Sequence, residues 1–307
     1  MNDDTVSQNS LRAWILAARP KTLTGAAVPV LIGGSLAIAQ SAGHISWLPF
    51  LLCMLFALTM QVDANFVNDY FDFVRGNDDE QRLGPKRACA EGWVTPRAMQ
   101  LAMAVTTLLA CLVGLPLVIF GGWPMVIVGA CCVLFCFLYT TTLAQVGMGD
   151  VLVLVFFGLL PVTLTYYLSM PQGQQSITPA CWIAAFACGL VIDTLLVVNN
   201  YRDIDNDRRV GKQTLVVLIG KTRGLRLYLL LGVLAVLLTT ALIPLGHRWA
   251  PWLPMAVYLP LHVSAYVDMK RIGQGAMLNR VLGKTARNML VFGLTLSAGF
   301  LLSLYLP

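Results

Sequence analysis

Long runs of apolar residues divide this chain, and short polar segments separate them. Each run is close to the roughly 20 residues with which an α-helix crosses the hydrocarbon core of a bilayer. A helix satisfies its own backbone hydrogen bonds, which lipid cannot do. The pattern predicts an all-α, polytopic membrane protein with nine transmembrane helices in one domain, residues 1–307, at about residues 23–41, 46–70, 98–119, 122–141, 149–170, 179–201, 223–246, 248–267 and 286–305.

The composition agrees with a protein embedded in a membrane. Hydrophobic residues make up 57% of the chain, charged residues only 12%, and the mean hydropathy is +0.72. Soluble domains contain fewer apolar and about twice as many charged residues. Most of the eight cysteines lie inside apolar runs, where a thiol is a small packing group, so they indicate no disulfide framework.

The positive charges follow the alternation of the predicted helices. Every Lys and Arg except Arg248 lies in residues 1–21, 75–97, 202–226 or 270–287, and nine alternating helices bring these segments to one side. The positive-inside rule assigns that side to the cytoplasm. The net charge of +6 therefore indicates topology rather than nucleic-acid binding, and residues 1–21 are expected to be a polar cytoplasmic segment.

A polar pentapeptide occurs twice, each time where an apolar run meets a basic loop. It reads Asn-Asp-Tyr-Phe-Asp at residues 68–72 and Asn-Asn-Tyr-Arg-Asp at residues 199–203. Carboxylates at the end of a membrane helix are costly unless they serve a polar cavity, a partner or an ion. The repetition suggests two halves that contribute to one functional site.

The spacing of the polar residues within these motifs favours a hard metal ion. Asn199, Asp203 and Asp207 follow one another at intervals of four, as do Asn68 and Asp72, so each set shares a helical face. Mg²⁺ prefers a few carboxylates together with water and substrate phosphates. The predicted metal ligands are Asn68, Asp72, Asp203 and Asp207. The three histidines are dispersed, which argues against a transition-metal site.

Each motif precedes a loop that contains glycine and several basic residues. The first loop contains Arg82, Lys86 and Arg87, and the second contains Lys212. Retention of positive charge in the cytoplasm explains any one of them. Two such loops beside two acidic faces instead resemble the halves of one diphosphate site.

Three classes of function are compatible with the acidic motifs. They are an enzyme acting on a diphosphate, an ion-coupled transporter with central carboxylates, and a structural protein whose carboxylates join helices. The duplicated basic loops favour the enzyme. Asp63 and Asp193 lie inside predicted helices without belonging to a motif, either lining the same polar cavity or forming protonated hydrogen bonds between helices.

Several motifs together resemble the UbiA superfamily of intramembrane prenyltransferases over nearly the full length. More narrowly, the chain is similar to the 1,4-dihydroxy-2-naphthoate polyprenyltransferase branch, which acts in menaquinone synthesis. The segments that carry this resemblance are residues 19–23, 68–70, 82–85, 149–151, 199–203 and 211–215. The chain departs from the superfamily pattern in having Gly76 four residues after Asp72, and Asn199 where the second motif often begins with Asp.

The resemblance implies a UbiA-type helical bundle with an active-site cavity inside the membrane. It implies Mg²⁺-dependent transfer of a polyprenyl group from polyprenyl diphosphate to 1,4-dihydroxy-2-naphthoate with decarboxylation, which gives demethylmenaquinol. Prenylation of 4-hydroxybenzoate or homogentisate is the alternative acceptor chemistry. A location in the bacterial cytoplasmic (inner) membrane follows, with the active site open to the cytoplasm.

The resemblance also suggests a role for each candidate residue. Asp72 and Asp203 are expected to hold the metal at the leaving group, and Asp69 to orient or deprotonate the acceptor phenol. Tyr70, Tyr139 and Tyr201 are candidates for stabilising the allylic cation, and Arg19 and Lys21 for holding the acceptor carboxylate or the diphosphate. The substrate-binding set is Arg19, Lys21, Asn68, Tyr70, Arg82, Lys86, Arg87, Tyr139, Asn199, Tyr201 and Lys212.

Overall fold

The computed structural model describes residues 6–76 and 83–306, and most of them are helical. All nine predicted apolar segments are helical over most of their length, which confirms the all-α class. The longer helices are α1 (Leu11–Ala18), α2 (Leu23–Gln40), α3 (Trp47–Val74), α4 (Pro96–Gly114), α6 (Pro124–Thr141), α8 (Leu160–Ser169), α9 (Pro179–Arg202), α12 (Lys221–Thr239), α13 (Leu259–Ile272) and α14 (Leu278–Tyr305). The short ones are α5 (Val118–Gly121), α7 (Gly149–Val153), α10 (Ile204–Arg209) and α11 (Leu215–Ile219).

Local sequence explains several helix boundaries. Thr95 and Thr178 accept a hydrogen bond from a backbone N–H in the first turn of α4 and α9, and each is followed by proline at the first helical position. A hydroxyl at the N-cap satisfies a donor that the helix leaves free, and proline has no N–H to leave unsatisfied. Pro124 also occupies the first position of α6, although no described side chain caps that helix.

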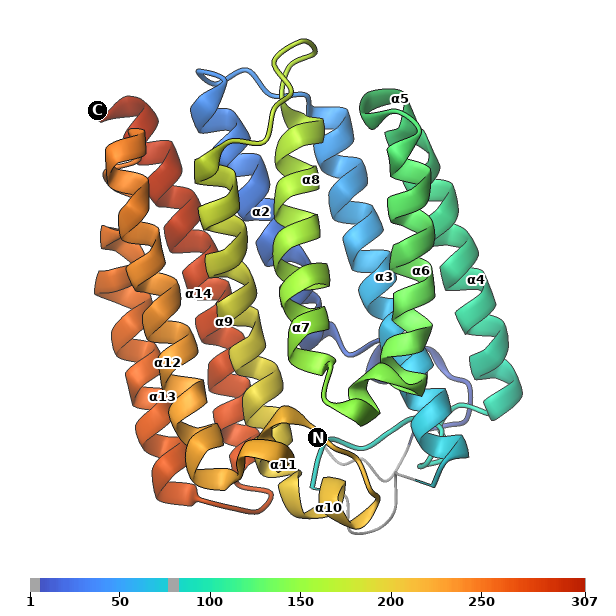
Figure 1. Cartoon of the computed structure of the whole chain (residues 1–307). Helices are drawn as coiled ribbons and strands as arrows, with labels where there is room; N and C mark the ends of the chain where they lie inside the picture. Colours follow the sequence, from blue (N-terminus) through green and yellow to red (C-terminus); the bar gives the residue numbers. More distant parts are fainter. Residues whose placement is uncertain (1–5, 77–82, 307) are drawn as a thin grey trace.

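Eight helical segments in the described part of the chain are long and apolar enough to cross a membrane. The remaining predicted span, residues 248–267, is helical from Pro254 and continues to Ile272, but it is less apolar because Asp268, Lys270 and Arg271 occupy its last turns. Its ends nevertheless lie at opposite ends of the bundle. Trp249 donates to the carbonyl of Leu306 near the end of α14, whereas α14 begins at the other end, beside the two motifs (Figure 1). The segment therefore connects the two ends of the bundle.

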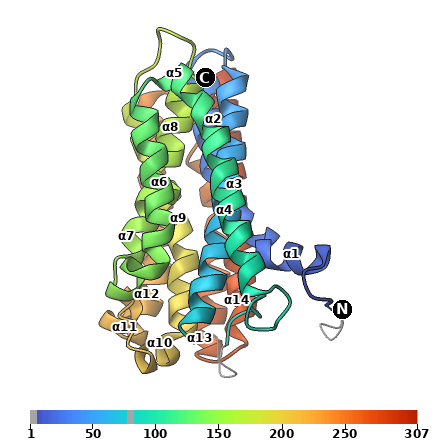
Figure 2. The same ribbon diagram turned by 90° about the vertical axis from the view of Figure 1, so that its right-hand side faces the viewer.

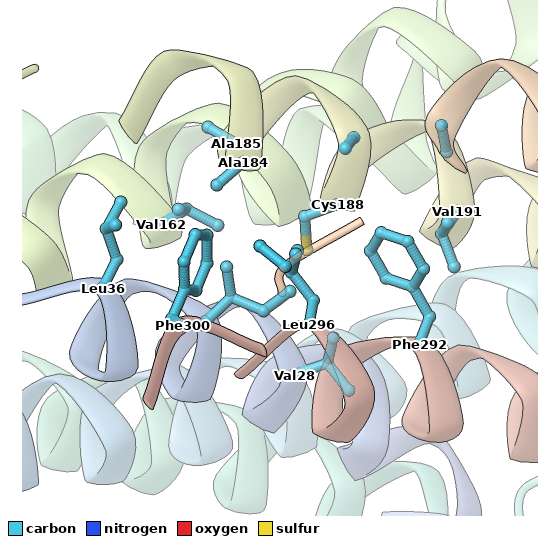
Figure 3. Close-up of a cluster of buried hydrophobic side chains, with 14 of the residues drawn as sticks. Val28, Leu36, Val162, Ala184, Ala185, Cys188, Val191, Phe292, Leu296 and Phe300 are labelled. Carbon is cyan, nitrogen blue, oxygen red and sulfur yellow. The ribbon is translucent and has the colours of Figure 1, made fainter. Parts of the chain in front are cut away.

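Small residues allow α9 to occupy the centre of the bundle. Ala184, Ala185 and Cys188 of α9 are fully buried against side chains of α2, α8 and α14, as Figure 3 shows. Gly158, just before α8, faces Gly189 so closely that an added Cβ would lie 2.6 Å from the Gly189 Cα. Such small residues let membrane helices approach each other closely. This packing fixes the end of α9 that carries the second motif.

The arrangement of the ends predicts which loops are reached from each side of the membrane. Gln213 and Gln274 are exposed at the end with the basic loops, and Gln172 is exposed at the other end. Cysteines at 213 and 274 should react with an impermeant maleimide only from the cytoplasmic side, and a cysteine at 172 only from the opposite side. Reaction of all three from one side would contradict this topology. Gln81, in the first basic loop, lies outside the described residues.

Candidate active site

Both pentapeptides lie at the same end of the bundle. Residues 68–72 form the last turns of α3, and residues 199–203 end α9 just before α10 (Figure 1). The Asn279 side chain at the start of α14 joins the loop that follows the first motif to the second motif: its amide donates to the carbonyl of Leu83 and its oxygen accepts from Arg202. The two motif regions, distant in sequence, are thus connected at one end of the protein.

Asp69 is buried and fully engaged by the protein. Its Oδ1 accepts from the backbone N–H of Cys89 at 2.8 Å and its Oδ2 from that of Ala88 at 2.9 Å, while the Arg19 guanidinium lies 3.5 Å from Oδ2. These bonds hold the loop after α3, and the turn between α1 and α2, against α3. That Asp69 orients or deprotonates the acceptor phenol stays a prediction.

Asp72 lies about one turn beyond Asp69 and is partly exposed. Its Oδ2 is 3.1 Å from the Arg87 guanidinium. Asn68 lies one turn before Asp72, and its side-chain oxygen accepts a hydrogen bond from the hydroxyl of Thr140 in α6. Arg87 of the basic loop thus balances the negative charge of Asp72, and Thr140 of α6 orients the side-chain amide of Asn68.

Arg202 organises the second motif. Its side chain is 1% exposed, and it donates to both carboxylate oxygens of Asp203 at 2.8 and 2.5 Å. It also donates to the side-chain oxygens of Asn199 at 2.9 Å and Asn279 at 2.7 Å. Such a planar, bidentate pairing holds a carboxylate in a defined orientation. Arg202 therefore sets the geometry of the polar residues around it.

Asp207 in α10 is buried near Lys212. One carboxylate oxygen lies 3.7 Å from the Lys212 ammonium, and the other has no hydrogen-bond partner among the described residues. Burial raises the pKa of the Asp207 carboxyl to about 6, although the charge of Lys212 opposes this shift. A buried carboxylate oxygen without a partner is suited to receive a cation.

A cavity of about 1590 Å³ connects this end of the protein with the interior of the bundle. Arg19, Lys21, Asn68, Asn199, Asn279 and Arg287 line its polar part. Deeper in the bundle its wall is apolar and includes Phe56, Leu117, Met125 and Leu168. Typical small-molecule pockets occupy about 300–1,000 Å³. The cavity is large enough for an amphiphile with a polar head and a long apolar chain.

The other candidates are distributed around this cavity. Tyr139 and Lys86 line it, and Lys86 also pairs with Glu91 at 3.1 Å. Tyr70 accepts a hydrogen bond from Gln100 outside the cavity, and Tyr201 is buried with the Lys221 ammonium 5.5 Å from its ring centre. These contacts connect the two tyrosines with neighbouring helices. Arg82 lies outside the described residues.

Several polar residues of the site were not selected from the sequence. Arg202 lies inside the second motif, where a positive charge next to two amide side chains and a carboxylate indicates an ion pair. Asn279 and Arg287 belong to α14, which begins at Leu278 rather than near residue 286 as predicted. Those two extra turns carry one wall of the cavity's polar part.

The two carboxylates outside the motifs have different surroundings. Asp63 is fully buried, and the hydroxyls of Thr106 and Thr107 in α4 donate to its two oxygens at 2.5 and 2.8 Å. It therefore joins α3 to α4. Asp193 in α9 is 6% exposed, and its Oδ1 has no partner among residues 6–76 and 83–306.

The chemistry of the donors can be compared with that of a magnesium site. Asp72, Asp203 and Asp207 offer carboxylate oxygens and Asn68 an amide oxygen, which are ligands that Mg²⁺ accepts. Within the described ranges, no three His, Cys, Asp or Glu side chains are close enough to form a complete metal site. Mg²⁺ commonly takes only one or two protein carboxylates and fills its shell with water and phosphate oxygens. The donor set fits that mode of binding.

Comparison with known proteins identifies the family. Residues 26–277 match the model of the UbiA prenyltransferase family. The chain is 35% identical to the 1,4-dihydroxy-2-naphthoate octaprenyltransferase of Escherichia coli, over 97% of this chain and 99% of the relative. It is 33% identical to the protein of that name from Mycobacterium tuberculosis, over 94% and 96% of the two chains.

A solved structure shares the fold. The UbiA homologue from Archaeoglobus fulgidus bound to GPP and Mg²⁺ superposes with a TM-score of 0.64 over 93% of this chain and 99% of that one, at 15% identity. Because the family model covers most of the sequence and the relatives align over nearly all of it, this chain belongs to the UbiA prenyltransferase family.

Proposed function

We propose that this prenyltransferase transfers a polyprenyl group from polyprenyl diphosphate to 1,4-dihydroxy-2-naphthoate with loss of CO₂. The observation that carries the proposal is the cavity, which joins basic side chains and the motif amides Asn68 and Asn199 to a long apolar interior. The names of the relatives at 33–35% identity support the choice of acceptor. We further propose that the protein resides in a bacterial inner membrane, with this polar end facing the cytoplasm.

The proposed reaction exchanges a C–O bond for a C–C bond. The allylic C–O bond of the donor breaks, and diphosphate leaves with the bonding electrons. The ring carbon that bears the acceptor's carboxylate forms the new C–C bond. Its bond to the carboxylate then breaks, CO₂ leaves, and the electron pair returns to the ring, which gives demethylmenaquinol.

The basic residues at this end of the protein fall into two proposed groups, one that binds the diphosphate and one that binds the acceptor carboxylate. Lys212 lines a smaller pocket next to Tyr139 and pairs with Asp207, and it is the proposed ligand of the diphosphate oxygens. Arg19, Lys21 and Arg287 line the cavity wall and are candidates for the acceptor carboxylate. The ring of Tyr139, also on the wall, can stabilise positive charge on the allylic carbon. The apolar wall excludes water, which would otherwise capture that carbon.

Mg²⁺ is the proposed cofactor, held by Asp72, Asp203, Asp207 and Asn68 together with the diphosphate. When bound, it neutralises charge on the leaving group. Removal of divalent cations with EDTA is expected to lower turnover to background, and added Mg²⁺ to restore it, because Arg and Lys alone leave the diphosphate charge incompletely balanced. Product formation is the measurement. Full turnover in excess EDTA would contradict the metal requirement.

Substitution of Lys212 by methionine tests which substrate this loop binds. Methionine retains much of the stem and removes the charge, so we expect the KM for prenyl diphosphate to rise about 10- to 100-fold, the equivalent of a hydrogen bond to a charged group. The KM for dihydroxynaphthoate should change little. Lys270→Met, at an exposed lysine of α13, is the matched control and should leave both constants unchanged. A selective effect on dihydroxynaphthoate would instead assign Lys212 to the acceptor.

The choice of acceptor is tested by competition. Purified protein in liposomes receives Mg²⁺, a polyprenyl diphosphate and an equimolar mixture of 1,4-dihydroxy-2-naphthoate, 4-hydroxybenzoate and homogentisate, and mass spectrometry identifies the prenylated products. We expect the dihydroxynaphthoate product to dominate. Dominance of a benzoquinone precursor would overturn the proposed acceptor and retain the prenyl transfer.

A further inference from the structure

The helix α1 has a different orientation from the helices of the bundle. Figure 2 shows it running outward, across the direction of α2 and α3, at a level nearer the middle of the bundle than α10 and α11 are. The turn into α2 passes through Arg19, whose φ of 50° is left-handed, a conformation uncommon in residues other than glycine. The chain is held at this turn in an orientation that directs α1 away from the bundle.

One side of α1 is fixed firmly to α3. Ala13 and Ala17 are buried, and the ring of Trp14 meets the edge of Phe66 at a centroid distance of 5.7 Å. Asn65 of α3 donates at 2.8 Å to the carbonyl of Ala18, which ends α1. These contacts make α1 a fixed part of the protein and place it level with residues 65–69 of α3.

The other side of α1 is apolar and exposed. Leu11 is 78% exposed, Ile15 50% and Leu16 37%, and their spacing of four and five places them along one side of the helix. Ile15 and Leu16 also line the cavity, whose polar wall continues directly into Arg19 and Lys21. An apolar stripe thus lies at the rim of the cavity, next to basic residues.

We propose that α1 lies in the membrane interface, with Leu11, Ile15 and Leu16 among lipid acyl chains, and forms the rim over which a membrane-borne prenyl diphosphate moves into the cavity. Two observations select lipid as the occupant. The stripe continues the apolar outer surface of the spans, where residues such as Leu101 and Leu108 of α4 are 67% and 61% exposed. The basic residues that follow α1 suit the phosphates of lipid headgroups.

This placement also fixes the depth of the site. Because α1 is level with residues 65–69 of α3, Asp72 lies about one turn further toward the water. The diphosphate-binding groups are then in the headgroup layer, and the apolar part of the cavity is at the depth of the acyl chains. A prenyl diphosphate can keep its head in that layer and its chain in lipid while it crosses α1.

The membrane position of α1 can be measured without any catalytic assay. Nitroxide labels at positions 11 and 15 of the full chain in liposomes, with Cys111, Cys131, Cys132 and Cys136 replaced by alanine, report accessibility to oxygen relative to a water-soluble nickel complex. We expect ratios that approach the ratio of a label at 108 in α4 and exceed that of a label at 213 in the second basic loop. A ratio at 11 and 15 equal to that at 213 would overturn the interfacial placement.

The role of α1 as a rim, which rests on the proposed function, is tested with two donors. Leu11→Glu introduces a charge on the lipid side of α1, away from the cavity wall. We expect at least about a three-fold higher KM for octaprenyl diphosphate in liposomes and an unchanged KM for the soluble geranyl diphosphate. Leu101→Glu in α4 is the matched control and should change neither constant.

The outcomes separate the two proposals. An unchanged KM for octaprenyl diphosphate in Leu11→Glu would overturn the role of the rim. Failure of the unsubstituted protein to prenylate any acceptor would overturn the proposed function, whereas the label accessibilities would still decide where α1 lies.

Discussion

Replacing Asp72 or Asp203 by asparagine is expected to lower turnover by more than about 100-fold, because each substitution removes a charge proposed to hold the metal at the leaving group. Asp72 is 20% exposed, so Asp72→Asn should remain folded in the membrane. Asp203→Asn removes the charge that pairs with the buried Arg202, so its rate is compared only after its folding has been confirmed. The measurement is initial rate at saturating substrates, with gel filtration as the test of folding. Asp205→Asn is the matched control, since Asp205 lies between Asp203 and Asp207 and is 79% exposed.

Two results would count against this assignment. Turnover within a few-fold of the unsubstituted protein would remove that aspartate from the metal site. An equal loss in Asp205→Asn would show that the effect comes from the local charge of α10 rather than from the ligands.

Replacing Arg202 by methionine is expected to lower the free energy of unfolding by about 3 kcal/mol. The substitution removes the donors that satisfy Asp203, Asn199 and Asn279 and leaves a carboxylate without its partner in a largely buried position. Arg202→Lys should recover only part of the loss, because an ammonium cannot make the bidentate pairing. Thermal unfolding in detergent measures the effect.

The double variant Arg202→Met, Asp203→Asn separates the ion pair from the packing of the arginine stem. Removal of both charges should be less destabilising than Arg202→Met alone, because no unpaired carboxylate remains. If the double variant is as unstable as the sum of the single ones, the ion pair contributes little, and packing accounts for the loss.

The bundle could be predicted from sequence because bilayer thickness imposes a length on every apolar run. The first two turns of α14 cannot be predicted in this way, since Asn279, Arg280 and Lys284 interrupt the apolar pattern there. Residues 1–21, expected to be a polar segment, contain helix α1. Helix α1 is only eight residues long, and its apolar stripe is recognised only once its orientation is known.

The sequence predicts which residues gather at the site, but it does not predict the contacts that each of them makes. Sequence spacing places Asp69 and Asp72 on adjacent turns of one helix and does not distinguish the contacts that they make. Their contacts cannot be read from that spacing, because the loop after α3 folds back and donates the backbone N–H groups of Ala88 and Cys89 to Asp69. A contact between segments so far apart in sequence depends on the path of the loop, which no local pattern encodes. The pairing of Arg202 with Asn279 depends on packing of α9 against α14 in the same way.

The most direct test of the account follows one turnover with 1,4-dihydroxy-2-naphthoate labelled with ¹³C at its carboxylate. Purified protein in excess over polyprenyl diphosphate, with Mg²⁺, should release labelled CO₂ and diphosphate in equal amounts and form an unlabelled prenylated product in the same amount. Omission of the prenyl diphosphate should abolish CO₂ release. Diphosphate release without a prenylated product, or CO₂ release without the donor, would contradict prenyl transfer to this acceptor in the cavity between the two motifs.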